Sequence, residues 1–262
     1  MEKAGGIDMS FLIADKISCH FGGLVAVDRV SFRVEPGEIF AIIGPNGAGK
    51  TTIFNLLSGF LPLAGGEIHY KGKRVDGLPP HRLAGRKMIR TFQDARLFTN
   101  MKVLDNCLVG MHCHSKRNII ATSLRIPSVV KSEALLKKKA FQILERIGLE
   151  GRINEMAGEI PFGEQRLLEL ARAEAAGPEL LLLDEPAAGL NIMETVHLAK
   201  QIKRLNRSGI TIVIIEHDMR LIMSIADRVA VINSGQKIAE GAPEKVQNNP
   251  DVIEAYLGVS DA

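Results

Sequence analysis

Residues 44–51 have the types and the spacing of a loop that holds phosphate groups. They read Gly44-Pro45-Asn46-Gly47-Ala48-Gly49-Lys50-Thr51, which matches the pattern G-x-x-x-x-G-K-[ST] in full. Glycines allow backbone N–H groups to turn toward phosphate oxygens, and the N-terminus of a following helix attracts the same negative charge. We expect this loop and the next residue, Thr52, to bind a nucleotide, with Lys50 at the β- and γ-phosphates and the Thr51 hydroxyl as a Mg²⁺ ligand.

A second candidate is the carboxylate pair Asp184-Glu185, which directly follows a run of leucines at 180–183. A buried parallel strand explains the leucines by themselves. The carboxyl ends of such strands are, however, where α/β sheets bind ligands. We therefore expect Asp184 to hold Mg²⁺ through water and Glu185 to polarise the attacking water.

Two further polar residues indicate a function only when the residues around them are considered. His217 follows an apolar run at 210–215, and a lone histidine is more often structural than catalytic. A strand there delivers it to the same sheet edge as Lys50 and Glu185, so we expect a contact to the γ-phosphate. Gln93 lies between two differently patterned parts of the chain and carries no meaning alone.

The elements that must position these residues alternate between short apolar strands and amphipathic helices. This order indicates an α/β fold with a mainly parallel sheet surrounded by helices. The first two strands favour an antiparallel sheet at the edge, and the last two a hairpin around Asn233-Ser234-Gly235. The expected strands cover residues 11–17, 25–34, 38–43, 180–183, 210–215, 227–232 and 236–240, and the expected helices cover about 50–57, 130–147, 192–207 and a C-terminal segment ending at Leu257.

The middle of the chain departs from this alternation. Residues 115–128 mix Ser, Lys, Arg, Asn and Pro with scattered Ile and read as a variable insertion. The helix expected at 130–147 places Leu136, Ala140, Ile143 and Ile147 on one face. We predict a helical subdomain at about 94–161, inserted into one α/β domain built from about 1–93 and 162–262.

Composition narrows the class of protein. The chain has 262 residues, 46% hydrophobic residues and a net charge of +3. The length and apolar content suit one large domain, and so small a charge argues against a nucleic-acid partner. No apolar run approaches the roughly 18–20 residues that span a bilayer, and the first residues lack the apolar core of a signal peptide. We expect a cytoplasmic protein that reaches a membrane only through a partner.

The cysteines indicate reduced thiols, because three of them, Cys19, Cys107 and Cys113, make an odd and sparse set. Cys107, Cys113 and the neighbouring histidines, His112 and His114, suggest zinc, but their spacing fits no standard pattern. We expect free side chains at the surface, with metal binding as the alternative.

Five ordered motifs together resemble the ATPase subunits of ABC transporters, over nearly the whole chain. They are the phosphate loop, Gln93, the signature segment Ile160-Pro161-Phe162-Gly163-Glu164-Gln165, the pair Asp184-Glu185, and His217. The resemblance implies the ABC ATPase fold, a P-loop ATPase core with an antiparallel β subdomain and the inserted helical subdomain.

The same resemblance implies how ATP is bound. ATP and Mg²⁺ would lie between two ATPase subunits in a head-to-tail dimer, where one subunit provides the phosphate loop and the other provides Gly163 and Glu164. Gln93 would contact Mg²⁺, assist catalysis and relay to a membrane subunit. Phe21 matches the aromatic residue that stacks on adenine, and a buried core phenylalanine is the alternative.

A narrower resemblance points to LivG-type ATPases of branched-chain amino acid importers. It rests on residues 21–27 (Phe-Gly-Gly-Leu-Val-Ala-Val), 90–93 (Arg-Thr-Phe-Gln) and 252–258 (Val-Ile-Glu-Ala-Tyr-Leu-Gly), and on the insertion around 115–128. It implies two membrane permease subunits and, indirectly, a periplasmic or extracellular solute-binding protein. Related ATPases for urea or lipopolysaccharide share parts of the pattern, so the solute stays open.

Two departures from the family pattern affect the expected dimer. Pro161 and Phe162 stand where the signature usually has serine and glycine, and Pro161 offers neither a hydroxyl nor an N–H to a phosphate. Asn191 stands where an acidic residue is usual. We therefore expect a different ATPase chain as the partner, one with an intact signature.

Two rival classes use a similar phosphate loop, namely other P-loop enzymes and non-transport ABC proteins. A GTPase would carry an Asn-Lys-x-Asp motif, which this chain lacks, and a small-molecule kinase would lack Gln93, the signature and His217 as a series. Non-transport ABC proteins usually carry two ATPase units or a long coiled coil, and this sequence has neither.

Overall fold

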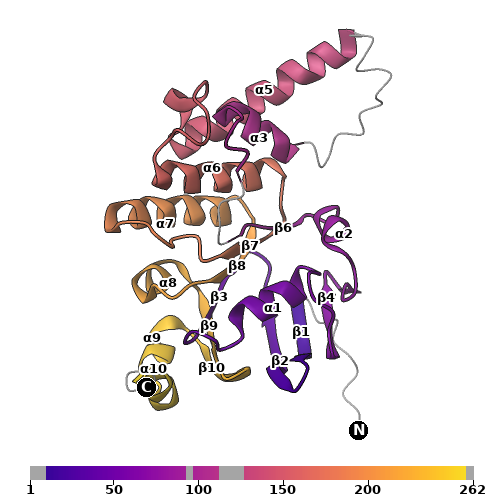
Figure 1. Ribbon diagram of the computed structural model, residues 1–262, viewed down its shortest axis with the longest axis vertical. Helices are drawn as coiled ribbons and strands as arrows, with labels where there is room; N and C mark the ends of the chain where they lie inside the picture. The colour runs from indigo at the N-terminus through magenta and orange to yellow at the C-terminus, as the bar shows by residue number, and fades with distance from the viewer. Residues whose placement is uncertain (1–9, 93–96, 112–126, 258–262) are drawn as a thin grey trace.

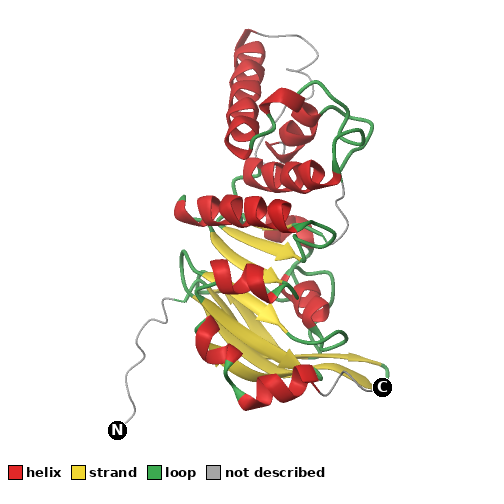
Figure 2. Cartoon of the chain, turned by 90° about the vertical axis from the view of Figure 1, so that its left-hand side faces the viewer, coloured by secondary structure: helices red, strands yellow, loops and turns green. Residues whose placement is uncertain are grey.

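The computed structural model describes residues 10–92, 97–111 and 127–257 of the chain. Two sheets and several helices make up the molecule; one group of helices is gathered at one end, and the other helices lie around the sheets (Figures 1 and 2). Most of the expected insertion at 115–128 lies outside the described residues. None of the described helices is long and apolar enough to cross a membrane.

The larger sheet has six strands in the order β10-β9-β3-β8-β7-β6. Three of its inner strands, β3, β8 and β7, are short and mostly apolar, and each of their residues is buried, because helices or the second sheet cover both faces. All neighbouring pairs are parallel except β9 and β10, which form the expected hairpin. The strands are β3 (Ile39–Ile43), β6 (Met88–Arg90), β7 (Leu180–Asp184), β8 (Thr211–Ile215), β9 (Arg228–Asn233) and β10 (Gln236–Gly241).

The second sheet is antiparallel, as expected, in the order β2-β1-β4-β5. Its strands are β1 (Leu12–Phe21), β2 (Leu24–Val34), β4 (Gly65–Tyr70) and β5 (Lys73–Arg74). The sequence analysis did not anticipate β4 and β5. Helix α1 (Lys50–Leu57) and one face of the larger sheet share a core with this sheet, in which Phe40 stacks on Phe32 at 5.3 Å between ring centroids.

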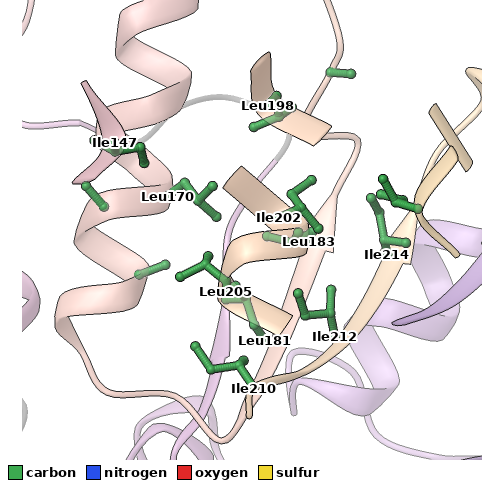
Figure 3. Close-up of a cluster of buried hydrophobic side chains, with 14 of the residues drawn as sticks. Ile147, Leu170, Leu181, Leu183, Leu198, Ile202, Leu205, Ile210, Ile212 and Ile214 are labelled. Atoms are coloured by element: carbon green, nitrogen blue, oxygen red, sulfur yellow. The ribbon is translucent and has the colours of Figure 1, made fainter. Parts of the chain in front are cut away.

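A second core lies on the other face of the larger sheet. Helix α7 (Ile192–Arg207) packs there through Leu198, Ile202 and Leu205, as Figure 3 shows. Alternate strand residues, such as Leu181 and Leu183, point toward this helix, because successive side chains of a strand face opposite sides.

Three helices pack beyond α7, namely α3 (Val103–Met111), α5 (Pro127–Ile147) and α6 (Phe162–Ala175). The face predicted for the helix at 130–147 is confirmed, since Ala140, Ile143 and Ile147 are buried and Leu136 packs against them. The division into subdomains at about 93 and 162 remains a proposal, and α6, on the core side of that division, packs against α3 and α5.

The remaining described elements are short. They are α2 (Pro80–Ala84), the 3₁₀ turn η2 (Glu150–Arg152), α8 (Met219–Ile225), α9 (Pro243–Gln247) and α10 (Pro250–Leu257).

The expectation that Cys107 lies at the surface is wrong. Cys107 is fully buried, and its Sγ lies 3.9 Å from the Ala140 carbonyl oxygen and 4.0 Å from that of Ala171. The physical reason is helical periodicity, because α3 turns Val103, Cys107 and Met111 toward the core. Burial raises the pKa of the Cys107 thiol to about 12.

The remaining cysteine and the histidines near Cys107 complete the comparison with the expected free thiols. Cys19 is also buried, and both it and Cys107 are free thiols. Cys113, His112 and His114 lie outside the described residues, and within those residues no three His, Cys, Asp or Glu side chains form a metal-binding group.

Candidate nucleotide site

The phosphate loop joins the end of β3 to the start of α1, as predicted. Its glycines have positive φ angles, 152° at Gly44, 78° at Gly47 and 102° at Gly49. A Cβ on Gly44 would lie 2.0 Å from the Ile232 carbonyl oxygen, and one on Gly49 would lie 2.5 Å from that of Ala26. The loop therefore needs glycine for its conformation and for its close packing against neighbouring strands.

Lys50 is buried, and its ammonium group is held by the loop itself. Its Nζ donates hydrogen bonds to the carbonyl oxygens of Gly44, at 2.7 Å, and Pro45, at 2.9 Å. Burial lowers the pKa of Lys50, and the nearby Glu185 carboxylate opposes this shift. The carbonyl oxygens of the loop thus hold the ammonium group inside the loop.

A surface pocket of ≈ 550 Å³ opens beside the loop and collects most of the predicted nucleotide-binding residues. Phe21 lines it from the tip of the β1–β2 hairpin and is 47% exposed, so the alternative of a buried core phenylalanine is wrong. The predicted residues along the pocket are Phe21, Asn46, Gly47, Ala48, Gly49, Lys50, Thr51, Thr52 and Glu185, and the unanticipated ones are Leu24, Val25, Ala26, Ser234 and Gly235.

The unanticipated residues come from the start of β2, directly after the β1–β2 turn, and from the β9–β10 turn. The Gly235 N–H donates a hydrogen bond to the Ala48 carbonyl oxygen, and the Gly235 carbonyl oxygen accepts one from the Asp28 N–H. These bonds fix the β9–β10 turn against the loop. The sequence marks both turns by glycine but contains no signal that they meet at the loop.

Asp184 is the last residue of β7 and Glu185 follows it, and the two side chains have different environments. Asp184 is buried, and its Oδ2 accepts a hydrogen bond from Nη2 of Arg90 at 2.7 Å. Glu185 has φ 45°, a left-handed conformation that costs of order 1–3 kcal/mol for a residue other than glycine. Its N–H donates to the Ile215 carbonyl oxygen, and its side chain lines the pocket. The turn therefore directs the second acid, not the first, toward the pocket.

His217 lies beside Glu185, because β8 is the neighbour of β7 in the sheet. Its Nδ1 is 3.7 Å from Oε2 of Glu185, and the imidazole is largely exposed. His217 does not line the pocket around the loop. The sheet brings Lys50, Glu185 and His217 to one edge, in agreement with the predicted positions.

Glu216 is a residue that the sequence analysis missed. Its side chain is fully buried and accepts N–H groups from Ala187, at 2.7 Å, and His217, at 3.1 Å. Burial raises the pKa of this carboxyl group, and these hydrogen bonds oppose the shift. Glu216 thereby ties the segment after Glu185 to the segment that carries His217, and only its polar type within an apolar region could have signalled it.

The signature segment lies away from the pocket. Pro161 precedes α6 without a side-chain cap, and Phe162 is exposed with its ring 5.1 Å from the Arg166 guanidinium. Gly163 packs so closely that a Cβ would lie 2.5 Å from Glu194, and Glu164 pairs with Arg152. Neither Gly163 nor Glu164 lines the pocket of its own chain.

Gln93 lies outside the described residues. Asn191 caps α7, since its side chain accepts the Glu194 N–H while the Glu194 side chain accepts the Asn191 N–H. The unusual asparagine thus has a structural role at the start of α7.

The donors expected for Mg²⁺ fit that ion. Thr51 and Asp184 offer a hydroxyl and a carboxylate, and hard divalent cations prefer oxygen ligands. Mg²⁺ is commonly bound by one or two carboxylates together with water and substrate phosphates. The residues therefore suit a metal that arrives with a nucleotide.

The sequence of this chain matches two protein families and several of their members. Residues 27–188 match the ABC transporter family, and residues 236–262 match the branched-chain amino acid ATP-binding cassette transporter family. The chain is 46% identical over 248 residues to the high-affinity branched-chain amino acid transport ATP-binding protein LivG of Escherichia coli, across 94% of this chain and 97% of that protein. The BraF protein of the same description from Pseudomonas aeruginosa is 45% identical over 243 residues, across 92% and 95%.

Solved structures of ATP-binding cassettes have the same fold as this chain. The ADP conformation of an ATP-binding cassette of an ABC transporter has a TM-score of 0.83 and 33% identity, and covers 95% of this chain and 99% of that chain. A nucleotide-free cassette has a TM-score of 0.82 and 32% identity, with the same coverage. The predicted ABC ATPase fold is confirmed, and so is the resemblance to LivG-type proteins. This chain belongs to the ABC transporter family.

Proposed function

We propose that this chain is the ATP-hydrolysing subunit of an importer that takes up branched-chain amino acids. The observation that carries the proposal is the joint placement of Lys50, Glu185 and His217 at adjacent strand ends, beside a pocket that Phe21 borders. The solute follows from the relatives, whose names specify high-affinity branched-chain amino acid transport.

In the proposed reaction, the loop N–H groups and Lys50 bind the phosphates of ATP, and Phe21 stacks on adenine. Glu185 accepts a proton from the water that attacks the γ-phosphate, while His217 contacts that phosphate. Thr51, Asp184 and Gln93 would hold Mg²⁺, which supplies positive charge to the phosphate oxygens. Lys50 exchanges its hydrogen bonds to loop carbonyls for bonds to phosphate oxygens.

The proposed working unit is a head-to-tail dimer with a different ATPase subunit. Gly163 and Glu164 lie outside the chain's own pocket, which supports a role at the partner's nucleotide. We place the dimer on two permease subunits at the cytoplasmic face of the cell membrane, with a solute-binding protein delivering substrate from the other side. Urea, other amino acids and lipopolysaccharide are the competing cargoes.

The test is transport by the complete assembly. The chain, its partner ATPase and the permeases are reconstituted in vesicles with the solute-binding protein, and ATP-dependent uptake of labelled leucine and urea is compared. Leucine uptake that disappears with Lys50→Ala is the expected result. ATP hydrolysis accompanied by urea uptake, with no leucine uptake, would overturn the assigned solute while leaving the ATPase assignment intact.

A further inference from the structure

Arg90, at the end of β6, carries a buried guanidinium group that none of the predicted chemistry uses. Its Nη1 donates to Oδ1 of Asn55 at 2.8 Å and to Oγ of Ser58 at 2.7 Å, both close to the end of α1. Its Nη2 donates to Oδ2 of Asp184 at 2.7 Å. One side chain therefore connects the helix that follows the phosphate loop to the carboxylate expected to hold Mg²⁺.

Three aromatic rings surround the same guanidinium. Its central carbon lies 5.6 Å from the ring centroid of Phe54, 5.5 Å from that of Phe60 and 5.2 Å from that of Phe92. Aromatic faces attract cations, and a planar guanidinium is well suited to such contacts. These rings and the hydrogen bonds hold the charge of Arg90 in place whether or not Asp184 has another partner.

Asp184 needs such a partner when no metal is bound. A buried carboxylate without a compensating charge is strongly destabilising, and within the described residues Asp184 is the one acidic side chain that hydrogen-bonds this guanidinium. A second cation that binds the same carboxylate shares its charge with Arg90 and is repelled by Arg90. The pair therefore stabilises the metal-free site at the expense of the metal-bound site.

We propose that Arg90 is a resident counter-cation of Asp184 that weakens Mg²⁺ binding and so sets the metal affinity of the nucleotide site. The proposal rests on the proposed function, because it takes Asp184 as the Mg²⁺ residue. It assigns Arg90 a positioning role through Asp184, and it explains how a buried acid can lose its metal with the product without being left uncompensated.

The experiment measures the metal dependence of ADP binding, which requires no turnover. Calorimetry gives the ADP dissociation constant of the full chain with EDTA and with saturating Mg²⁺. The constant with EDTA divided by the constant with Mg²⁺ reports how much the metal contributes to binding. In Arg90→Met and Arg90→Gln this ratio should exceed the wild-type ratio by about tenfold or more, equivalent to about 1.4 kcal/mol. Arg90→Lys, which keeps the charge, and Ser58→Ala, which keeps the Arg90–Asp184 pair, should stay within about threefold of wild type, roughly 0.6 kcal/mol.

The outcomes separate this inference from the proposed function. No ADP binding by the wild-type chain would contradict the nucleotide site itself. Normal wild-type binding with an unchanged or smaller ratio in both neutral variants would overturn only the role of Arg90. Thermal unfolding provides the second measurement, because the neutral variants should regain stability with ADP and Mg²⁺. Variants that remain unfolded under those conditions would mean that Arg90 serves the fold alone and would also overturn the proposal.

Discussion

Replacing Glu216 by glutamine is expected to weaken the fold and slow ATP hydrolysis together. Both carboxylate oxygens of Glu216 act as acceptors, Oε1 for the Ala187 N–H and Oε2 for the His217 N–H. A glutamine amide has one oxygen, so one of these N–H groups would face an NH₂ group and lose its partner. Losing a hydrogen bond to a charged acceptor costs about 1.5–3 kcal/mol.

The net cost in Glu216→Gln should be smaller than that figure, because the neutral amide avoids the burial of a charge. Burial already raises the pKa of Glu216, which shows that the charged form carries a desolvation cost. We expect a loss of about 1–2 kcal/mol near pH 8, or roughly 2–8 °C in Tm. As the pH falls toward the raised pKa, the folded wild-type chain takes up a proton and gains stability that the glutamine variant cannot gain, so the difference should widen.

The assay combines thermal unfolding over a pH series that descends from pH 8 with ATP hydrolysis by the assembled transporter. Glu38→Gln is the matched control, because burial also raises the pKa of Glu38, which precedes β3 at the end opposite the phosphate loop. The control should lose stability but keep the maximal hydrolysis rate, whereas Glu216→Gln should lose rate through displacement of His217. A stability difference that shrinks or stays constant as the pH is lowered, or a rate that matches the control, would refute the reasoning.

Three further predictions concern the nucleotide site. Glu185→Gln should retain ATP binding and lose about 10²–10⁴-fold in turnover, and phosphate release within a few-fold of wild type would contradict its role as the base. Phe21→Ala should weaken ATP binding by about tenfold or more, since stacking on a base contributes about 1–3 kcal/mol, and unchanged affinity by calorimetry would argue against stacking. Lys50→Ala should reduce transporter ATPase activity more than the equivalent change in the partner ATPase. The partner's phosphate loop faces Pro161 and Phe162 of this chain, so that site lacks a hydrogen-bond donor worth roughly 10²–10³-fold in rate. Equal losses, or full activity of this chain as a homodimer, would exclude the asymmetry.

Some of the structure could be predicted because local pattern alone decides it. The apolar runs that form β3, β7 and β8 are short and continuous, and each is followed by polar or glycine residues that must lie at a strand end. The phosphate loop is recognisable because its glycines adopt conformations that other residues rarely reach. Helix α7 has the predicted bounds, 192–207, because its apolar stripe is a local pattern.

Other features were missed because their signals are short or depend on distant residues. Strands β5 and β6 contain two and three residues, too few to show a period. Helix α3 was not recognised, and Cys107 was placed at the surface, because the apolar stripe of α3 is meaningful only with α5 and α6 packed against it.

The sequence by itself determined which residues could bind and cleave a nucleotide, since motif spacing and strand ends are properties of neighbouring residues. Only the tertiary structure decided which of these residues meet. Arg90 and Asp184 are 94 positions apart, and no local pattern links them. They become a pair because β6 lies next to β7 in the sheet, where a buried carboxylate must find a cation. The order of the strands depends on how both apolar faces of the sheet are covered, and this order thus completes the site.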